Sequence, residues 1–201
     1  MRRLVLTAVA GMILVLVSLA FAHSSLEGYS GAPGTNGTCA ANCHGSPGGT
    51  IQVTGFPAEY EPGQTYTINI THDGGDLIRQ FNASCRVGAG SENAGMIAAG
   101  TNTETYNNLK ESNGVHFSSD NHSLGSFDWT APALGTGEVR LYLAGLQGGY
   151  NGLNSAMILT SAEQAQACGD TNCDGSINIG DAVYLINYIF KSGPAPCSAC
   201  Q

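Results

Sequence analysis

The stretch Pro62-Gly63-Gln64-Thr65-Tyr66-Thr67-Ile68-Asn69-Ile70 decides the fold class. Pro-Gly is a turn signal, and apolar and polar residues alternate directly after it. Successive side chains of a β-strand point to opposite faces of the sheet. The stretch therefore predicts a turn followed by a strand that is buried on one face only.

The same alternation recurs along residues 50–160, in short runs separated by Gly, Asn, Asp and Pro. Nothing in this region has a helical period. The apolar positions of the further runs are Ile51 and Val53; Phe81, Ala83, Cys85 and Val87; Phe127 and Trp129; Val139, Leu141 and Leu143; and Met157 and Leu159. Such runs predict an antiparallel β-sandwich over residues 50–160. Cys85 falls on the apolar side of its run, so we expect a buried free thiol there.

The first 22 residues have the pattern of a secretory signal peptide. Arg2 and Arg3 precede a mostly apolar run, Leu4–Leu19, and Ala20-Phe21-Ala22 matches an A-x-A cleavage site. We expect cleavage after Ala22 and a secreted, periplasmic or cell-surface protein, with an uncleaved membrane anchor as the alternative.

Composition supports this interpretation. Only 11% of the 201 residues are charged, and 28 are Gly. Such a composition is typical of an exported, β-rich chain with long loops. The formal charge is −8 and becomes −10 without Arg2 and Arg3. This acidity argues against nucleic acid and anionic membrane surfaces as partners.

The residues that indicate a cofactor site are Cys39-Ala40-Ala41-Asn42-Cys43-His44, within a glycine-rich segment, residues 23–49. Haem c is usually attached at C-x-x-C-H, and this stretch has one extra residue. Cys39 and Cys43 are predicted to form the thioether bonds to one haem, with His44 as its proximal ligand. A local disulfide, or a zinc site with His44 and a remote ligand, are the alternatives.

A haem iron held by His44 can take a sixth ligand from the chain. The candidates are His23, His72, His116, His122, Met96 and Met157. We predict His116, whose side chain is expected to point away from its apolar neighbours, with His122 second. Ligation on both sides favours electron transfer, because no iron position is left open for a substrate.

A calcium loop is predicted at Gly169–Asp181, after a polar linker at residues 161–168. The side-chain and carbonyl oxygens at the ligand positions come from Asp170, Asn172, Asp174, Ser176, Asn178 and Asp181. Their spacing, with Gly175 at the sharp turn, is what Ca²⁺ requires, so we expect one ion. The alternative is an Asx-rich turn that caps the next helix. That helix is predicted from Asp181 to Phe190 and ends before Gly193-Pro194.

The C-terminal module, residues 169–201, is too small to close its own core. Val183, Ile186 and Phe190 lie along one side of the helix, which must pack on the sandwich or on a partner chain. Four cysteines bracket the module and predict two disulfides in an exported chain. Cys168–Cys197 with Cys173–Cys200 is one plausible pairing of the three that four cysteines allow.

Two resemblances follow from these residues. The segments Ser30–Gly34, Cys39–His44, Gly55–Pro57, Tyr60–Tyr66, Phe127–Pro132 and Val139–Gly145 resemble the bacterial choice-of-anchor domains related to the Reeler domain, over residues 28–160. This resemblance implies an exported immunoglobulin-like β-sandwich, often with a c-type haem motif at its front. It also suggests a His upstream of Trp129, which agrees with His116. Residues 169–196 resemble one repeat of a type I dockerin, which normally has two.

The predicted function is that of an extracellular monohaem c-type cytochrome-like electron carrier rather than an enzyme. The calcium module would attach the protein to a cohesin-like partner or assemble copies of the chain, as in a filament. Its partners would be redox proteins or neighbouring copies. One alternative is a non-redox adhesion or scaffold module in which Cys39–Cys43 is a disulfide. Another is a copper or haem enzyme that uses His23 or an open iron.

Overall fold

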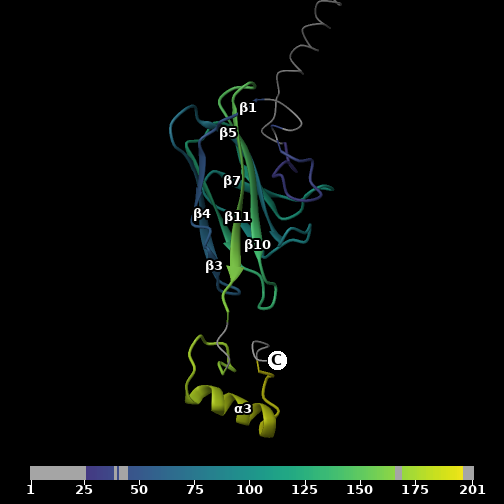
Figure 1. Ribbon diagram of the computed structural model, residues 1–201, viewed down its shortest axis with the longest axis vertical. Coiled ribbons are helices and arrows are strands. Elements are labelled where there is room, and N and C mark those ends of the chain that lie inside the picture. The colour runs from purple at the N-terminus through teal and green to yellow at the C-terminus, as the bar shows by residue number, and fades with distance from the viewer. Residues whose placement is uncertain (1–25, 39, 41–44, 166–168, 197–201) are drawn as a thin grey trace, which may run out of the picture.

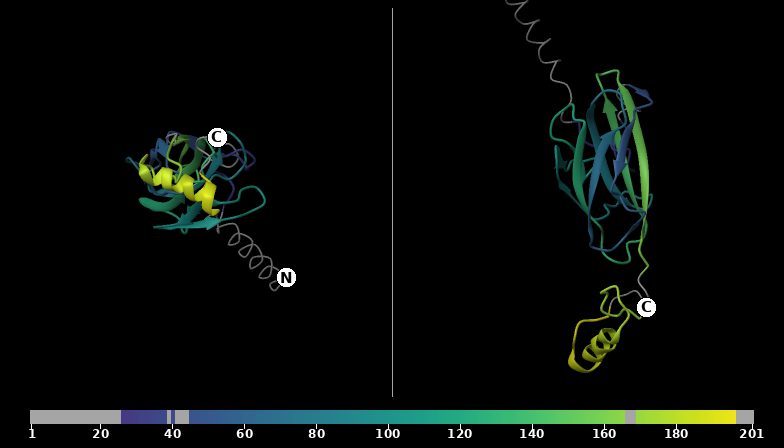
Figure 2. Two further views of the ribbon diagram at one scale, coloured as in Figure 1. Left: turned by 90° about the horizontal axis from the view of Figure 1, so that it is seen from below. Right: turned by 90° about the vertical axis from the view of Figure 1, so that its left-hand side faces the viewer.

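The computed structural model describes residues 26–38, 40, 45–165 and 169–196. Its described strands form two sheets that face each other, as Figures 1 and 2 show. One sheet has four strands in the order β2-β4-β9-β6, and all its neighbours are antiparallel. These strands are β2 (Ile51–Thr54), β4 (Thr65–His72), β6 (Met96–Ala99) and β9 (Leu124–Thr130).

The other sheet has seven strands, in the order β1-β11-β10-β5-β8-β7, with β3 also on β11. They are β1 (Ser46–Pro47), β3 (Glu59–Tyr60), β5 (Ile78–Val87), β7 (Thr103–Tyr106), β8 (Gly114–Phe117), β10 (Val139–Gln147) and β11 (Leu153–Glu163). Two of its pairings, β1–β11 and β3–β11, are parallel. The fold is thus mainly β, as predicted, with short parallel additions that the alternating pattern did not indicate.

The core lies between the two sheets and is centred on Trp129, which is completely buried. The rings of Phe56, Tyr60 and Tyr66 surround it at centroid distances of 5.1, 5.6 and 5.8 Å. The indole Nε1 donates a hydrogen bond of 2.9 Å to the carbonyl oxygen of Ala94. This bond satisfies the only polar group that a buried Trp side chain brings into a core.

All the alternating runs noted in the sequence are strands. Along β5, Phe81, Ala83 and Cys85 lie in the core, so Asn82 and Ser84 face outward. Cys85 is a free thiol with no exposed surface, which confirms that prediction.

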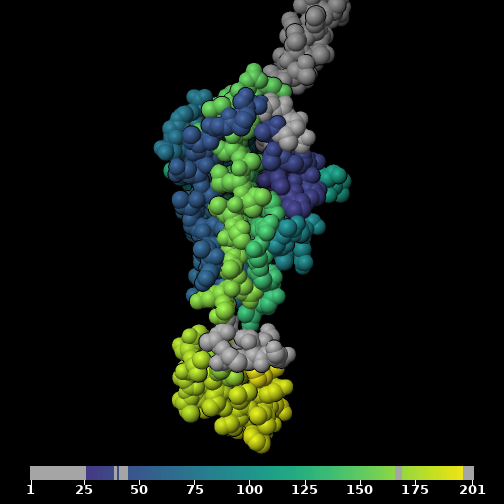
Figure 3. All heavy atoms as spheres, in the orientation of Figure 1, coloured from purple at the N-terminus to yellow at the C-terminus, as the bar shows by residue number. Residues whose placement is uncertain are grey.

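The N-terminal segment, residues 26–38, covers part of the outer face of the seven-stranded sheet. Asn82 Nδ2 donates to the carbonyl oxygen of Leu26 at 2.9 Å, and Tyr29 N donates to Asn82 Oδ1 at 3.3 Å. Figure 3 shows this segment, in purple, against the side of the sandwich. The outward-facing polar residues of β5 are therefore buried by a loop rather than by a second layer of strands.

Helix α3 (Ile179–Lys191) is the main element of the C-terminal module and begins two residues before the predicted start. Asn178 and Asp181 form a reciprocal capping box at its start, and Ser192 ends it in the left-handed conformation. In Figures 1 and 2 the helix lies beyond one end of the sandwich and covers neither sheet. No helix in the described part of the chain has the length and apolar character needed to cross a membrane.

Candidate functional site

The predicted haem-attaching residues, Cys39, Cys43 and His44, lie outside the described residues, as does His23. Ala40 and both flanks of the motif are described. The upstream flank folds into a tight loop: Gly31 N donates to Gly37 O at 3.0 Å, and Asn36 N donates to Gly28 O at 2.8 Å. The motif thus follows a segment that is closed on itself and attached to the sheet.

The attachment of this flank depends on a buried carboxylate, Glu111, whose side chain has no exposed surface. Its Oε1 accepts hydrogen bonds from the hydroxyls of Ser30 and Ser84 and lies 3.6 Å from Arg86 Nη2. Its Oε2 accepts from the Tyr106 hydroxyl at 2.7 Å. We name Ser30, Ser84, Arg86, Tyr106 and Glu111 the Glu111 cluster. Because Ser30 comes from the N-terminal segment and the other four residues come from the sheet side, the cluster joins the two.

Burial raises the pKa of the Tyr106 hydroxyl, and the neighbouring Glu111 carboxylate raises it further. Tyr106 therefore remains a neutral donor to Glu111 over the whole physiological range. No sequence pattern indicated this cluster, because Glu111 is a single acidic residue in a polar stretch. Its partners are brought to it by the pairing of β5, β8 and β7.

The downstream flank, residues 45–49, is fixed to β11. Ser46 N donates to Gly152 O at 3.1 Å, and Gly49 N donates to Asn154 O at 3.0 Å. Gly45 has a φ of +85°, and a Cβ there would collide with the side chain of Asn154. Glycine is therefore required at the residue that follows His44, because the backbone approaches β11 too closely for a side chain.

A cavity of about 390 Å³ lies between this flank and the edge of β11. It is lined by Ala40, Pro47, Gly48, Gly49, Ile51, Asn154, Ser155, Ala156 and Met157. Its volume is within the range of small-molecule sites in proteins, roughly 300–1,000 Å³. Ala40, the described residue of the Cys39–His44 motif, therefore lies beside a hollow rather than against a filled surface.

The predicted sixth ligands are dispersed. His116 is buried on β8 and points away from its core neighbours Val115 and Phe117, as expected. Its Nε2 lies 3.3 Å from Glu104 Oε1, and its ring meets the ring of Tyr106 edge-on at 5.2 Å. His122 is hydrogen-bonded through Nε2 to Ser119 Oγ at 2.9 Å.

The remaining candidates differ in exposure. His72 contacts the carbonyl oxygen of Gly74 through Nδ1 at 2.8 Å. Met96 is 69% exposed on β6, whereas Met157 is half-buried. Of the five sixth-ligand candidates that the structure describes, Met157 is the one that lines the cavity beside Ala40.

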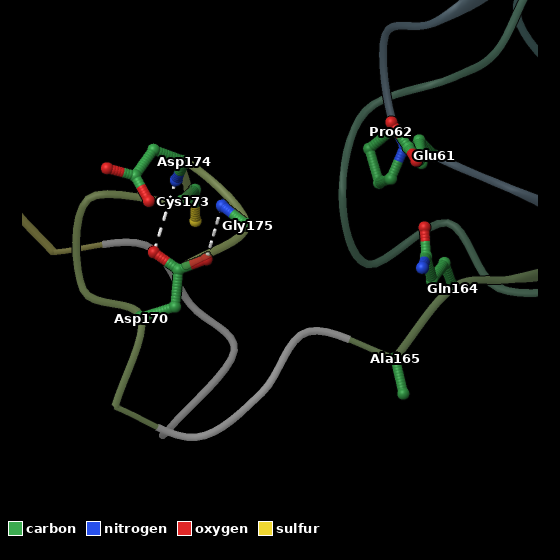
Figure 4. Close-up of a pocket in the computed structure, with 8 residues that line it drawn as sticks. All are labelled: Glu61, Pro62, Gln164, Ala165, Asp170, Cys173, Asp174 and Gly175. Carbon is green, nitrogen blue, oxygen red and sulfur yellow. Dashed lines mark hydrogen bonds between the residues drawn. The ribbon is translucent and has the colours of Figure 1, made fainter. Parts of the chain in front are cut away.

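The predicted calcium loop closes on itself through its acidic side chains. Asp170 Oδ1 and Oδ2 accept from the N–H groups of Asp174 and Gly175 at 3.1 and 2.8 Å, as Figure 4 shows. Asp181 Oδ1 accepts from Thr171 N at 2.7 Å, and its Oδ2 accepts from Asn178 N at 2.8 Å. These contacts hold both ends of the loop around the carboxylates of positions 1 and 12.

The middle of the loop is also ordered by its own oxygens. Asn172 Oδ1 accepts from Asp174 N at 3.0 Å, and Asn172 Nδ2 donates to Asp174 Oδ2 at 2.8 Å. Asp174 Oδ1 accepts from Ser176 N at 2.9 Å, while Asn178 Nδ2 donates to the Ser176 carbonyl at 3.1 Å. Gly175 makes the sharp turn with a φ of +84°. All the predicted ligand residues therefore belong to one closed loop.

The donor set of the loop fits a hard cation. Asp170 and Asp181 are 2% and 4% exposed, and no Lys or Arg of the described residues pairs with Asp181. Hydrogen bonds from backbone amides, chiefly that of Asn178, lower the pKa of Asp181, which is therefore charged near neutral pH. Within the described residues, no three Asp, Glu, His or Cys side chains converge as a metal cluster. A cation here would draw on amide and carbonyl oxygens as well as carboxylates.

Across an open space from Asp170 lie Glu61 and Pro62 of the sandwich and Gln164 and Ala165 of the linker (Figure 4). Cys173, within the loop, is disulfide-bonded. Cys168, Cys197 and Cys200 lie outside the described residues, so the predicted connectivity stays a prediction.

No protein-family model matches the sequence, and no curated protein matches it. The solved structures include similar ones. Two fragments of the human F-spondin reeler domain share 21% and 22% identity, cover 60% of this chain and 96% and 91% of their own, and give TM-scores of 0.48 and 0.45. The Reelin-N domain of F-spondin shares 21% identity over 60% of this chain and 89% of its own, with a TM-score of 0.47. The sandwich itself is established by the strand pairing of this chain, independently of that similarity.

Proposed function

We propose that the protein is an extracellular electron carrier with one covalently bound haem c on the edge of a β-sandwich. Cys39 and Cys43 would hold the haem through thioether bonds, and His44 would be its proximal ligand. The haem would supply the one-electron chemistry, and the protein would bind and orient it.

The observation that supports this proposal best is that both flanks of the motif are attached to the sandwich. The Glu111 cluster attaches the upstream flank to the sheet, and β11 pairs with the downstream flank. Between them, Ala40 lines the cavity along β11. An N-terminal segment that binds nothing would need neither attachment, whereas a cofactor-binding loop needs both ends held and space beside it.

We also propose that the C-terminal module binds one Ca²⁺ through Asp170, Asn172, Asp174, Ser176, Asn178 and Asp181. The buried carboxylates of Asp170 and Asp181 in an oxygen-rich loop favour a cation, because a positive partner stabilises buried negative charge. Calcium binding would then stabilise the loop and the start of α3 together, since Asp181 belongs to both.

The exposed side of α3 supports an attachment role for this module. Large apolar side chains that are 45% or more exposed are Ile177, Ile179, Val183, Ile186, Tyr188, Ile189 and Phe190. A group of this kind on one short module is typical of a protein–protein contact surface. We propose that the surface binds a neighbouring copy of the chain or a cohesin-like protein.

The experiment that tests the haem is a pyridine haemochrome spectrum with intact mass, on calcium-loaded protein secreted from cells that have a cytochrome c maturation system. We expect a c-type spectrum and the added mass of one haem. The double variant Cys39→Ala/Cys43→Ala should lose both, while the matched control Cys85→Ala should keep both. Wild-type protein without haem would contradict the proposal and leave the adhesion module, with Cys39–Cys43 as a disulfide.

The attachment surface is tested by sedimentation with calcium and with chelator. We expect assembly only with calcium, and weaker assembly of Phe190→Ser. Leu109→Ser is the control, because Leu109 is fully exposed on the sandwich. A monomer under both conditions would exclude self-assembly.

A further inference from the structure

We propose that helix α3 binds the α3 of a second copy of this chain, antiparallel and across a two-fold axis, so that the protein forms a closed dimer rather than a filament. The inference rests on the proposed function, because it names the partner of the attachment surface on the C-terminal module. It does not depend on the haem, since all the residues involved lie within 169–196.

The spacing of apolar residues along α3 fits a second helix. Four of them lie on one line along the helix, which we call the α3 seam: Ile179, Val183, Ile186 and Phe190. Their intervals of four, three and four residues are those of the a and d positions of a coiled coil, where each side chain fits between the side chains of a facing helix. The seam is therefore suited to another helix rather than to a flat surface.

The α3 seam points away from the rest of its own module. With about 3.6 residues per turn, Asp181, Tyr184 and Leu185 lie on the opposite side of the helix. They are buried or half-buried, and the Tyr184 hydroxyl donates to the carbonyl oxygen of Ala195 at 3.4 Å. The seam residues, in contrast, are 50% to 80% exposed. The module thus uses one side of α3 for its own contacts and leaves the seam to another chain.

The order of the seam residues points to an identical chain as that partner. Intervals of four, three and four are the same in both directions, so two antiparallel copies of the seam match at every position. Ile179 of each copy would lie opposite Phe190 of the other, and Val183 would lie opposite Ile186. An interface in which one patch meets itself has two-fold symmetry and closes with two chains. The seam therefore favours a dimer over open growth.

Charge also favours this arrangement. The whole chain has a formal charge of −8, which opposes self-association, but the seam contains no charged residue. Lys191 is the one Lys or Arg in the sequence of residues 169–196, and it lies at the C-terminal end of α3. In the antiparallel arrangement Lys191 approaches the loop of the second copy, where Asp174 is exposed. Opposite charges would therefore meet at both ends of the helix pair.

The exposed apolar area indicates a weak dimer. The seam and the neighbouring Ile189, which is 63% exposed, offer on the order of 500 Å² per copy. Two copies would bury about 1,000 Å² in total, below the range of about 1,200–2,000 Å² that is typical of stable complexes. We therefore expect a dissociation constant in the micromolar range and a dimer that separates on dilution.

The experiment is analytical ultracentrifugation of the calcium-loaded secreted protein over a series of concentrations. Wild type should change reversibly from monomer to dimer as the concentration rises, with no larger species. Val183→Lys and Ile186→Glu should each remain monomeric, because each would bury an unpaired charge in the dimer. Leu109→Lys is the matched control, since it adds the same charge to an exposed site on the sandwich, and it should dimerise like the wild type.

An equimolar mixture of Val183→Lys and Ile186→Glu should dimerise again. The antiparallel arrangement places the new lysine of one copy opposite the new glutamate of the other, so the two charges pair. Recovery in the mixture would also show that both variants are folded. A mixture that stays monomeric while the wild type dimerises would overturn the arrangement.

Two further results would overturn the inference. Wild type that is monomeric at every concentration would leave the surface to a different protein, and a species that grows beyond the dimer would exclude a closed two-fold interface. The pyridine haemochrome and a calcium titration test the proposed cofactors separately. A monomeric wild type that binds both would overturn this inference alone, whereas a haem-free wild type that dimerises would overturn the haem proposal and support this inference.

Discussion

The sandwich and the C-terminal module differ in which side chains they bury. The sandwich encloses its large apolar side chains, among them Trp129, Phe81 and Phe127, with no exposed surface. In the module the pattern is reversed: Asp170 and Asp181 are buried, while Ile179 is 80% and Phe190 is 78% exposed. One region is stabilised mainly by apolar contacts and the other mainly by hydrogen bonds to carboxylates.

The difference shows what each region needs in order to stay folded. Apolar burial is supplied by the chain itself, so the sandwich requires no second component. If the module binds Ca²⁺ and a partner as proposed, its stability depends on both. The comparison therefore predicts that changes in the core affect the sandwich alone, and that changes in the loop affect the module alone.

The largest effect should come from Trp129→Ala. Removing an indole from the centre of the core leaves a cavity and an unpaired carbonyl at Ala94, at a cost of about 3–5 kcal/mol in the free energy of unfolding. Denaturant unfolding followed by the β signal in circular dichroism measures it, and Leu109→Ala is the exposed control. Equal loss of calcium binding in Trp129→Ala would show that the two regions are not independent.

Glu111→Gln should have the next largest effect. It leaves the guanidinium of Arg86 buried without its carboxylate, which costs about 3 kcal/mol. The damage should begin with the N-terminal segment, because a Gln amide offers one acceptor oxygen where the carboxylate offers two to Ser30, Ser84 and Tyr106. Limited proteolysis should then cut residues 26–38 before it cuts the strands. Glu104→Gln, at a half-exposed side chain, is the control, and equal proteolysis of both variants would contradict the role of the cluster.

Asp170→Asn should weaken calcium binding while the sandwich remains intact. Removing one carboxylate charge from the loop is expected to lower calcium affinity by about tenfold or more, or about 1.4 kcal/mol. Titration calorimetry measures the affinity, and Asp73→Asn, on an exposed turn of the sandwich, is the control. Calcium affinity that does not change in Asp170→Asn would exclude Asp170 as a ligand.

The contrast between the two regions also explains what the sequence could predict. The alternation around Ile68, Phe81 and Leu141 identified the long strands, because a strand buried on one face must alternate. The closed loop was predictable for a related reason: its predicted ligand residues are all local, so their spacing along the chain determines which of them can meet. The outward orientation of His116 followed from the same alternation.

What escaped prediction depends on contacts between distant residues. Strands β1 and β3 have two residues each, too few to show a period, and exist because β11 offers an edge. The cavity beside Ala40 requires residues 45–49 to meet Asn154, about a hundred positions away. The Glu111 cluster likewise joins Ser30 to residues of three other segments. No local sequence pattern indicates these contacts between distant residues.

The smallest effect concerns cysteine, which the two regions use differently: Cys173 is disulfide-bonded, whereas Cys85 is a free thiol in the core. Burial raises the pKa of the Cys85 thiol far above its ordinary value of 9.0. A raised pKa means that the folded state keeps its proton while the unfolded chain loses it. Stability from this group is therefore complete below about pH 9 and falls as the pH rises further.

Between about pH 9 and pH 10 this difference should lower the free energy of unfolding by about 1 kcal/mol, since a full pKa unit corresponds to about 1.4 kcal/mol. Denaturant unfolding at the two pH values measures the slope, and Cys85→Ala should remove that part of it. Tyr60 and Tyr106, whose hydroxyls also have raised pKa values, titrate in the unfolded chain near pH 10 and are common to both proteins. The same slope in Cys85→Ala would mean that the thiol is not protected by the core, and would remove one of the differences between the sandwich and the module.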